Sequence, residues 1–204
     1  MKVWKVAAAL IAAMVPAGVA TAPAHAGLLA QSAGKCPTLS SKQVFRPWLD
    51  IAQYVPAPGG TAESTTGWKL EGGATVVAGN EPWKVAGSGT RSLALPAGAK
   101  ATTSAACVGL GHPTMRFFAK RTSGTVLSTL KVEVLFDGLG GLVKSLPIGV
   151  VLGGSNWQPT LPFPVVANLL PLLPGQMTPV AFRFTAAGGT WQVDDVYVDP
   201  WRAR

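Results

Sequence analysis

The stretch VAFRFTAAGGTWQVDDVYVD, residues 180–199, decides the fold. In its first half, every second position is apolar, at Val180, Phe182 and Phe184. This two-residue period is typical of a β-strand with one buried face. A pair of glycines then predicts a turn, and a further strand begins at Trp191. Two strands joined by a glycine turn favour an antiparallel sheet.

The second of these strands changes phase in its middle. Under strict alternation, Trp191 and Val193 point to one side, whereas Val196 and Val198 point to the other. Either both faces of the strand are buried or a β-bulge inserts one residue, and in both cases one of the two intervening aspartates faces the interior. A buried carboxylate is unfavourable unless it is hydrogen-bonded or bound by a cation such as calcium.

Short strand patterns recur along the rest of the chain at intervals of about ten to fifteen residues, separated by Gly and Pro, without a sustained helical period. This spacing predicts an all-β protein with an antiparallel β-sandwich or barrel. The expected strands cover residues 68–71, 74–78, 92–95, 101–108, 115–119, 131–136, 142–152 (a pair broken at Pro147), 180–185 and 191–198.

The N-terminus has the three-part order of a signal peptide. Lys2 and Lys5 precede an apolar run at residues 6–15, and Ala24-His25-Ala26 forms a cleavage site. The apolar run is shorter than the roughly 20 residues that span a bilayer, which disfavours a membrane anchor. We therefore expect residues 1–26 to be removed and the protein to be secreted.

The remaining chain divides into a leader and one domain. Residues 27–60 predict an irregular N-terminal leader, in which residues 44–55 form either one helical turn or a strand. Residues 61–204 predict a single β-sandwich domain. Within it, the apolar residues 161–177 contain four prolines, which exclude strand and helix interiors. We interpret this segment as a connection packed over one sheet or, alternatively, as an exposed apolar surface for a partner.

Both cysteines, Cys36 and Cys107, lie in the part that we expect to be exported. An oxidising compartment makes a disulfide between them the default, with two buried free thiols as the alternative. The bond would close a loop of about 70 residues and stabilise the fold by roughly 4 kcal/mol in the chain-entropy model.

The charge balance is basic, with 17 Lys and Arg against 9 Asp and Glu. The basic residues are scattered along the chain, which favours a solvated surface over nucleic-acid binding. After removal of the signal peptide, His112 is the remaining histidine, and its Gly and Pro neighbours indicate a turn. The sequence lacks a Gly-x-Ser-x-Gly elbow, a His-Glu-x-x-His helix and a phosphate-binding glycine loop. We assign no catalytic residues, so a secreted hydrolase is the less favoured reading.

Three short motifs resemble those of a known family. Glu63 stands shortly before Gly67-Trp68, residues 87–95 read GSGTRSLAL, and the last strand contains WQVDDV at residues 191–196. Together they resemble the galactose-binding-like jelly-roll β-sandwiches, which include many carbohydrate-binding modules. The resemblance extends over about residues 61–200.

This resemblance implies a jelly-roll fold and either no cofactor or one structural calcium. Members of the family commonly bind the ion through an acidic residue of the early segment and an aspartate of the last strand. By resemblance, the ligands here are Glu63 and either Asp194 or Asp195. Hydrogen bonding of the aspartate pair without a metal is the alternative.

Sugar binding requires exposed aromatic rings, on which the C–H face of a sugar stacks. Trp83, Trp157 and Trp201 lie in loop-like contexts and are the candidate rings, with packing as the alternative role, whereas Trp68 and Trp191 belong to alternating strands and to the core. We expect a secreted, non-catalytic domain that binds a carbohydrate or another cell-envelope component. The alternative is a structural or protein-interaction domain that uses the apolar surface of residues 161–177.

Overall fold

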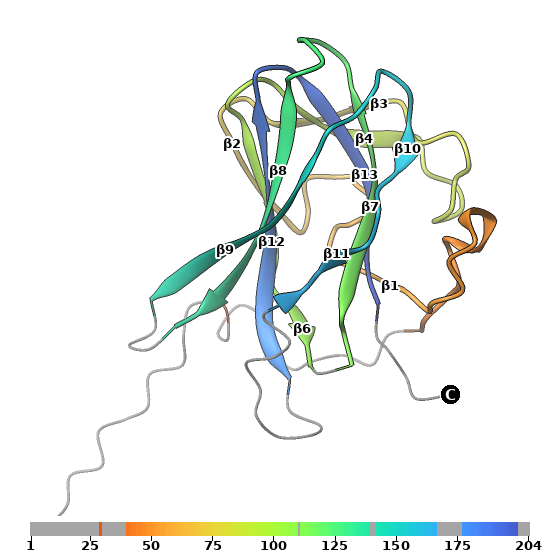
Figure 1. Ribbon diagram of the computed structural model, residues 1–204, viewed down its shortest axis with the longest axis vertical. Helices are drawn as coiled ribbons and strands as arrows, with labels where there is room; N and C mark the ends of the chain where they lie inside the picture. Colours follow the sequence, from red (N-terminus) through yellow and green to blue (C-terminus); the bar gives the residue numbers. More distant parts are fainter. Residues whose placement is uncertain (1–28, 30–39, 110, 139–141, 167–176, 200–204) are drawn as a thin grey trace, which may run out of the picture.

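The computed structural model describes residues 29, 40–109, 111–138, 142–166 and 177–199. These residues form two antiparallel sheets that pack face to face as a β-sandwich (Figure 1). Successive strands pass repeatedly from one sheet to the other, which is the connectivity of a jelly roll. The all-β, jelly-roll sandwich predicted from the sequence is therefore confirmed. In the described ranges, no helix is both long and apolar enough to cross a membrane.

The first sheet, here called the β13 sheet, has the order β10 (Gln158–Pro159), β7 (Thr114–Arg121), β13 (Trp191–Val198), β4 (Arg91–Leu95) and β3 (Thr75–Ala78), with β1 (Val55–Pro56) beside β13 and β11 (Phe163–Pro164) beside β7. The second, the β12 sheet, has the order β2 (Trp68–Glu71), β5 (Lys100–Thr103), β12 (Thr178–Ala187), β8 (Thr129–Asp137) and β9 (Val143–Val151), with β6 (Ala106–Val108) beside β12.

The main core lies between the two sheets and is built by the predicted alternation. Val180, Phe182 and Phe184 of β12 all point into it and are fully buried. Phe117 of β7 packs edge-on against Phe184, with ring centroids 5.0 Å apart. Trp68 packs at the edge of this core, and its indole N–H donates to the Gly59 carbonyl at 2.6 Å.

The phase change in the last strand is a β-bulge. The pairing of β13 with β7 shifts register between Asp194 and Tyr197, and Asp195 has a left-handed φ of 49°. This insertion turns both halves of the strand toward one core. The β13 side chains that enter the main core are Trp191, Val193, Val196 and Val198. Both aspartates of the bulge are buried.

Residues 40–57, here called the N-terminal segment, pack on the outer face of the β13 sheet (Figure 1). The segment contains the 3-10 helix η1 (Arg46–Trp48), and β1 ends it beside β13. Its apolar side chains form a second core with that outer face. The buried members of the second core are Val44, Phe45, Tyr54, Phe118 and Tyr197.

The turn that follows β1 comes very close to the bulge. The Val196 N–H donates to the Gly60 carbonyl, and the Ala57 N–H donates to the Val196 carbonyl, both at 2.9 Å. A Cβ atom on Gly60 would lie 2.4 Å from the Val196 carbonyl oxygen, so this approach requires glycine.

Two strand predictions were wrong. Residues 142–152 do not form a pair broken at Pro147, because β9 runs through this proline as one strand. β9 lies at the edge of the sheet, and its pairing with β8 is irregular next to Pro147, where a missing N–H is tolerated. Residues 101–108 form β5 and β6 rather than one strand. The chain leaves β12 between them, where the Ser104 N–H donates to the Gly67 carbonyl at 2.6 Å.

Candidate functional site

Three tryptophans gather on the outer face of the β13 sheet around Phe118 of β7. The rings of Trp48 and Trp83 lie 5.3 and 5.5 Å from that of Phe118, and 5.0 Å from each other. Trp157 packs against the second core, with the Lys120 ammonium 4.9 Å from the centre of its ring. Trp83 is 46% exposed. We call Trp48, Trp83 and Trp157 the tryptophan surface.

The structure thus brings together two of the three predicted sugar-binding tryptophans, Trp83 and Trp157. They are separated by 74 positions in sequence but share one face of one sheet. Trp48 completes the surface and was not predicted. The third predicted ring, Trp201, lies outside the described residues.

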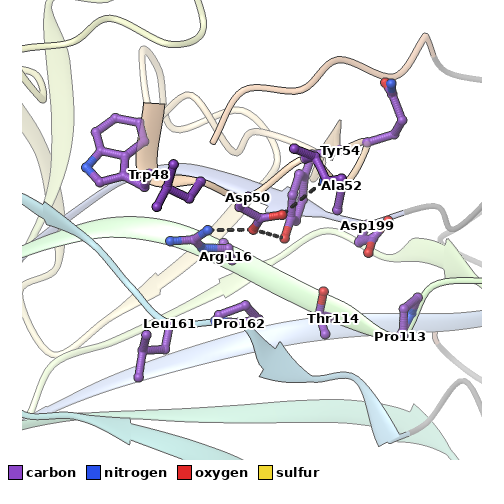
Figure 2. A pocket seen from close by; sticks show the side chains of 13 residues that line it. Trp48, Asp50, Ala52, Tyr54, Pro113, Thr114, Arg116, Leu161, Pro162 and Asp199 are labelled. Atoms are coloured by element: carbon purple, nitrogen blue, oxygen red, sulfur yellow. Dashed lines mark hydrogen bonds and ion pairs between the residues drawn. The ribbon is translucent and has the colours of Figure 1, made fainter. Parts of the chain in front are cut away.

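A cavity of about 790 Å³ adjoins the tryptophan surface, and Trp48 belongs to both. The N-terminal segment forms one wall, and the start of β7 with the connection before β11 forms the other (Figure 2). The polar side chains that line it include Asp50, Tyr54, Thr114, Arg116 and Asp199.

Asp50 and Arg116 form a partly buried ion pair in this cavity. Arg116 Nη1 donates to Asp50 Oδ2, and the Tyr54 hydroxyl donates to the same oxygen at 2.8 Å (Figure 2). Arg116 Nε donates to the Thr160 carbonyl at 2.8 Å, and its guanidinium carbon lies 4.4 Å from the centre of the Phe45 ring. The guanidinium is therefore held from several sides.

These contacts also set the charge of Asp50. Burial raises the pKa of its carboxyl, but hydrogen bonds from Arg116, Tyr54 and the Ala52 N–H outweigh burial and hold the pKa below its usual value. Asp50 is therefore ionised at neutral pH and neutralises Arg116.

Asp199 lines the same cavity but has fewer hydrogen-bond donors than Asp50. Its side chain is buried, and Oδ1 has no hydrogen-bond partner among the described residues. Burial and the nearby charge of Asp50 raise the pKa of Asp199 to about 6, against a hydrogen bond from Thr114 that lowers it. The cavity thus contains an unsatisfied acceptor beside a satisfied ion pair.

A second acidic cluster lies at the β13 bulge, where Asp194 and Asp195 meet Glu81. The Glu81 carboxylate accepts hydrogen bonds from the N–H groups of Trp83 and Val85, at 2.6 and 2.7 Å. Asp194 accepts from the N–H groups of Glu81 and Asp195, at 3.0 and 2.9 Å. The cluster therefore fixes the loop that carries Trp83.

The buried carboxyl of Asp195 lies against another carboxyl, that of Glu81. The Ala86 N–H favours the charged form of the Asp195 carboxyl, but burial and the Glu81 carboxyl oppose it. Burial, with the hydrogen bond to Glu81 and its charge, raises the pKa of Asp195 to about 7. Burial and the charge of Asp195 raise the pKa of Asp194 to about 8. A protonated Asp195 donates to Glu81 and removes the repulsion between the two.

Two of the predicted calcium ligands, Glu63 and Asp194, already accept hydrogen bonds from backbone N–H groups. Glu63 Oε1 accepts from the N–H groups of Thr90 and Arg91, at 2.8 and 3.0 Å, and Asp194 is held by the two N–H groups given above. Within the described ranges, no group of three or more His, Cys, Asp or Glu side chains is arranged to hold a metal ion. Calcium binding remains a prediction from the resemblance.

The other predicted positions contribute little to this face. Cys107 lies in β6, but Cys36 is outside the described residues, so the disulfide remains a prediction. His112 Nδ1 accepts from the Gly109 N–H at 3.0 Å, in a turn as expected. Of the apolar segment 161–177, residues 167–176 are outside the described ranges, and Leu161 and Pro162 line the cavity.

Comparisons with known proteins give similarities in structure alone. No protein-family model and no curated protein matches the sequence. Among solved structures, the CBM22-1 xylan-binding domain of Paenibacillus barcinonensis Xyn10C is 16% identical at a TM-score of 0.48, over 71% of this chain and 93% of that chain. TmCBM61, solved in complex with β-1,4-galactotriose, is 18% identical at a TM-score of 0.38, over 70% of this chain and 94% of that chain.

A second xylan-binding domain from CBM 22 is 16% identical at a TM-score of 0.48, over 76% of this chain and 99% of that chain. These three structures are carbohydrate-binding modules to which the chain is similar. The site itself is built from this chain's own residues, several of which lie in the N-terminal segment.

Proposed function

We propose that this is a secreted, non-catalytic protein that binds carbohydrate on the tryptophan surface and in the adjoining cavity. The observation that carries the proposal is the junction at Trp48, where a group of aromatic rings meets a cavity lined by polar side chains. Sugars present both kinds of surface, because their C–H faces are apolar and their rims carry hydroxyls.

Each part of the site fits one part of such a ligand. The half-exposed ring of Trp83 offers a flat apolar surface to a sugar face. The Asp50–Arg116 pair and the Tyr54 hydroxyl lie in the cavity beside it, held in place by their mutual hydrogen bonds. Rigid polar groups of this kind bind hydroxyls without a large loss of side-chain entropy.

Substitution of an exposed ring tests the binding surface. We expect Trp83→Ala to weaken binding to a soluble polysaccharide about tenfold, equivalent to ~1.4 kcal/mol, because the stacking surface is lost. Affinity electrophoresis against a panel of neutral and acidic polysaccharides measures the effect. Leu127→Ala, which removes an exposed apolar side chain in the turn between β7 and β8, is the matched control.

Two results would overturn the proposal: wild-type protein that is retarded by no polysaccharide of the panel, or a Trp83→Ala variant retarded as strongly as wild type. Secretion has its own test. Protein recovered from the culture medium should have the mass of a chain that begins at Gly27, whereas an intact N-terminus would contradict cleavage after residue 26.

A further inference from the structure

Asp199 is the polar group of the cavity whose bonding is incomplete. It is only 6% exposed, yet Oδ1 has no partner in the described part of the chain. Its backbone N–H donates to the Thr114 carbonyl at 2.8 Å, which fixes the end of β13 against β7. A buried acceptor without a donor is costly, so Oδ1, in a cavity wall, is an acceptor that the hydroxyl of a ligand can satisfy.

The charged and polar groups around Asp199 in the described part of the chain do not supply that donor to Oδ1. Arg116 and the Tyr54 hydroxyl are both directed to Asp50, as Figure 2 shows. Thr114 contributes a single hydroxyl. With Asp50 neutralising Arg116, the charge of Asp199 gives the cavity a net negative charge when this carboxyl is ionised. An acidic ligand is therefore repelled, and a neutral ligand that carries hydroxyl donors is favoured.

We propose that Asp199 sets the specificity of the cavity, accepting a hydrogen bond from a hydroxyl of a neutral sugar residue and excluding acidic sugars. This inference rests on the proposed carbohydrate-binding function and adds its ligand class. An acceptor of this kind discriminates strongly, because a ligand without the matching hydroxyl leaves the carboxylate buried and unpaired.

If Asp199 accepts a hydrogen bond from the sugar, the affinity for the sugar should depend on the protonation state of this carboxyl, which a purely structural role would not require. The pKa of this carboxyl is raised to about 6, so it is ionised at pH 8 and largely protonated at pH 5. An ionised carboxylate accepts a charge-assisted hydrogen bond, roughly twice as strong as a neutral one. Affinity for a neutral sugar should therefore fall as the pH is lowered through about 6.

The experiment is isothermal titration at pH 5 and pH 8 with defined probes. These are the neutral β-1,4-linked hexasaccharides of xylose, glucose and galactose, and the xylose hexasaccharide that carries one glucuronic acid. Wild type is compared with Asp199→Asn and with Glu71→Gln. The latter removes an exposed carboxylate from β2 in the other sheet and controls for net charge.

We expect wild type to bind a neutral hexasaccharide about tenfold more weakly at pH 5 than at pH 8. Asp199→Asn should bind weakly at both pH values and should discriminate less against the acidic probe, whereas Glu71→Gln should behave as wild type. Because Asp194 and Asp195 also titrate between pH 5 and pH 8, Asp195→Asn is measured beside wild type, and a pH profile that it shares with wild type is assigned to Asp199 even if Asp199→Asn folds poorly.

The outcomes separate this inference from the proposed function. If wild type binds a neutral hexasaccharide equally at both pH values, or Asp199→Asn keeps the affinity and pH profile of wild type, the role of Asp199 is refuted while carbohydrate binding stands. Preference for the acidic probe would also refute it. If wild type binds no probe and no polysaccharide of the panel, both proposals fail.

Discussion

At the scale of single residues, the neighbours of each carboxyl decide whether it is ionised or protonated. Asp50 has Arg116 and Tyr54 as donors and stays ionised, whereas Asp195 has the carboxyl of Glu81 as its neighbour and is held protonated near neutral pH. The sequence predicted a buried aspartate in the last strand, because the apolar positions before and after the aspartate pair are out of phase with each other. It did not predict Glu81, since nothing local in the sequence pairs residue 81 with residue 195.

The acidic cluster makes stability depend on pH. The pKa values of Asp194 and Asp195 in the folded protein, about 8 and about 7, are raised above their unfolded value of 3.8. Their stabilising contribution is thus fully present below about pH 4 and is lost as the pH rises through 7 to 8. We expect the free energy of unfolding, measured with urea, to decrease between pH 5 and pH 8.

Asp195→Asn should flatten this decrease, because an amide stays neutral at every pH. At pH 8 we expect the variant to be more stable than wild type by about 1 to 3 kcal/mol. Asp137→Asn, at a carboxyl at the end of β8 in the other sheet, provides the comparison. Parallel stability curves for wild type and Asp195→Asn would contradict the assignment of the proton to this cluster.

Removal of divalent cations tests the calcium prediction directly. Because Glu63 and Asp194 already accept N–H donors, we expect EDTA to leave the midpoint of thermal unfolding unchanged. Differential scanning calorimetry with EDTA, and then with excess calcium, measures this. A rise of several degrees with calcium alone would show that the ion, rather than a proton, satisfies the cluster.

At the scale of elements, the position and contacts of the N-terminal segment were the least predictable from the sequence. The prediction of a helical turn or strand at residues 44–55 concerned local conformation, and the structure has a single 3-10 turn there followed by β1. What the segment does depends on contacts with β7 and β13, which lie far away in sequence. Phe45, Trp48 and Asp50 therefore carried no local signal of a site.

Phe45 should hold this segment on the sheet. It is fully buried, and its ring lies 4.9 Å from that of Tyr54 and 5.6 Å from that of Phe118. We expect Phe45→Ala to destabilise the docked segment by about 3 kcal/mol, in the range typical of buried Phe→Ala changes. Hydrogen exchange should then accelerate at the Lys42 and Tyr54 amides, which donate to each other's carbonyls.

The amides of β12 should keep their protection in Phe45→Ala, because the main core is untouched. Ile51→Ala, at a half-exposed side chain of the same segment, serves as the control and should exchange like wild type. Equal acceleration in the N-terminal segment and β12 would show that the second core does not unfold separately from the main core.

At the scale of the whole molecule, alternation and turn residues were sufficient to predict a β-sandwich. Period-two patterns such as Val180, Phe182 and Phe184 specify a buried face directly. The residues of the proposed binding face were predictable only in part. Trp83 and Trp157 were recognised by their loop contexts. Arg116 lies within an apolar strand and Asp199 at a strand end, so neither position indicated a site. The cavity that both line is formed by segments that are far apart in sequence.

The expected disulfide would affect the stability of the whole molecule. If Cys36 and Cys107 are bonded, reduction should lower the free energy of unfolding by about 4 kcal/mol, because the bond closes a loop of about 70 residues. Thiol titration of the unfolded protein, with and without prior reduction, counts the bonds. Two titratable thiols in the unreduced secreted protein would contradict the prediction.

The most direct test of carbohydrate binding at the tryptophan surface is to follow the indole N–H signals by nuclear magnetic resonance during titration with a polysaccharide-derived oligosaccharide. The signals of Trp48, Trp83 and Trp157 should shift together with increasing ligand. Those of Trp191, which is fully buried, and Trp68, which is bonded to Gly59, should stay in place. Binding that leaves the first three signals unchanged would contradict the account.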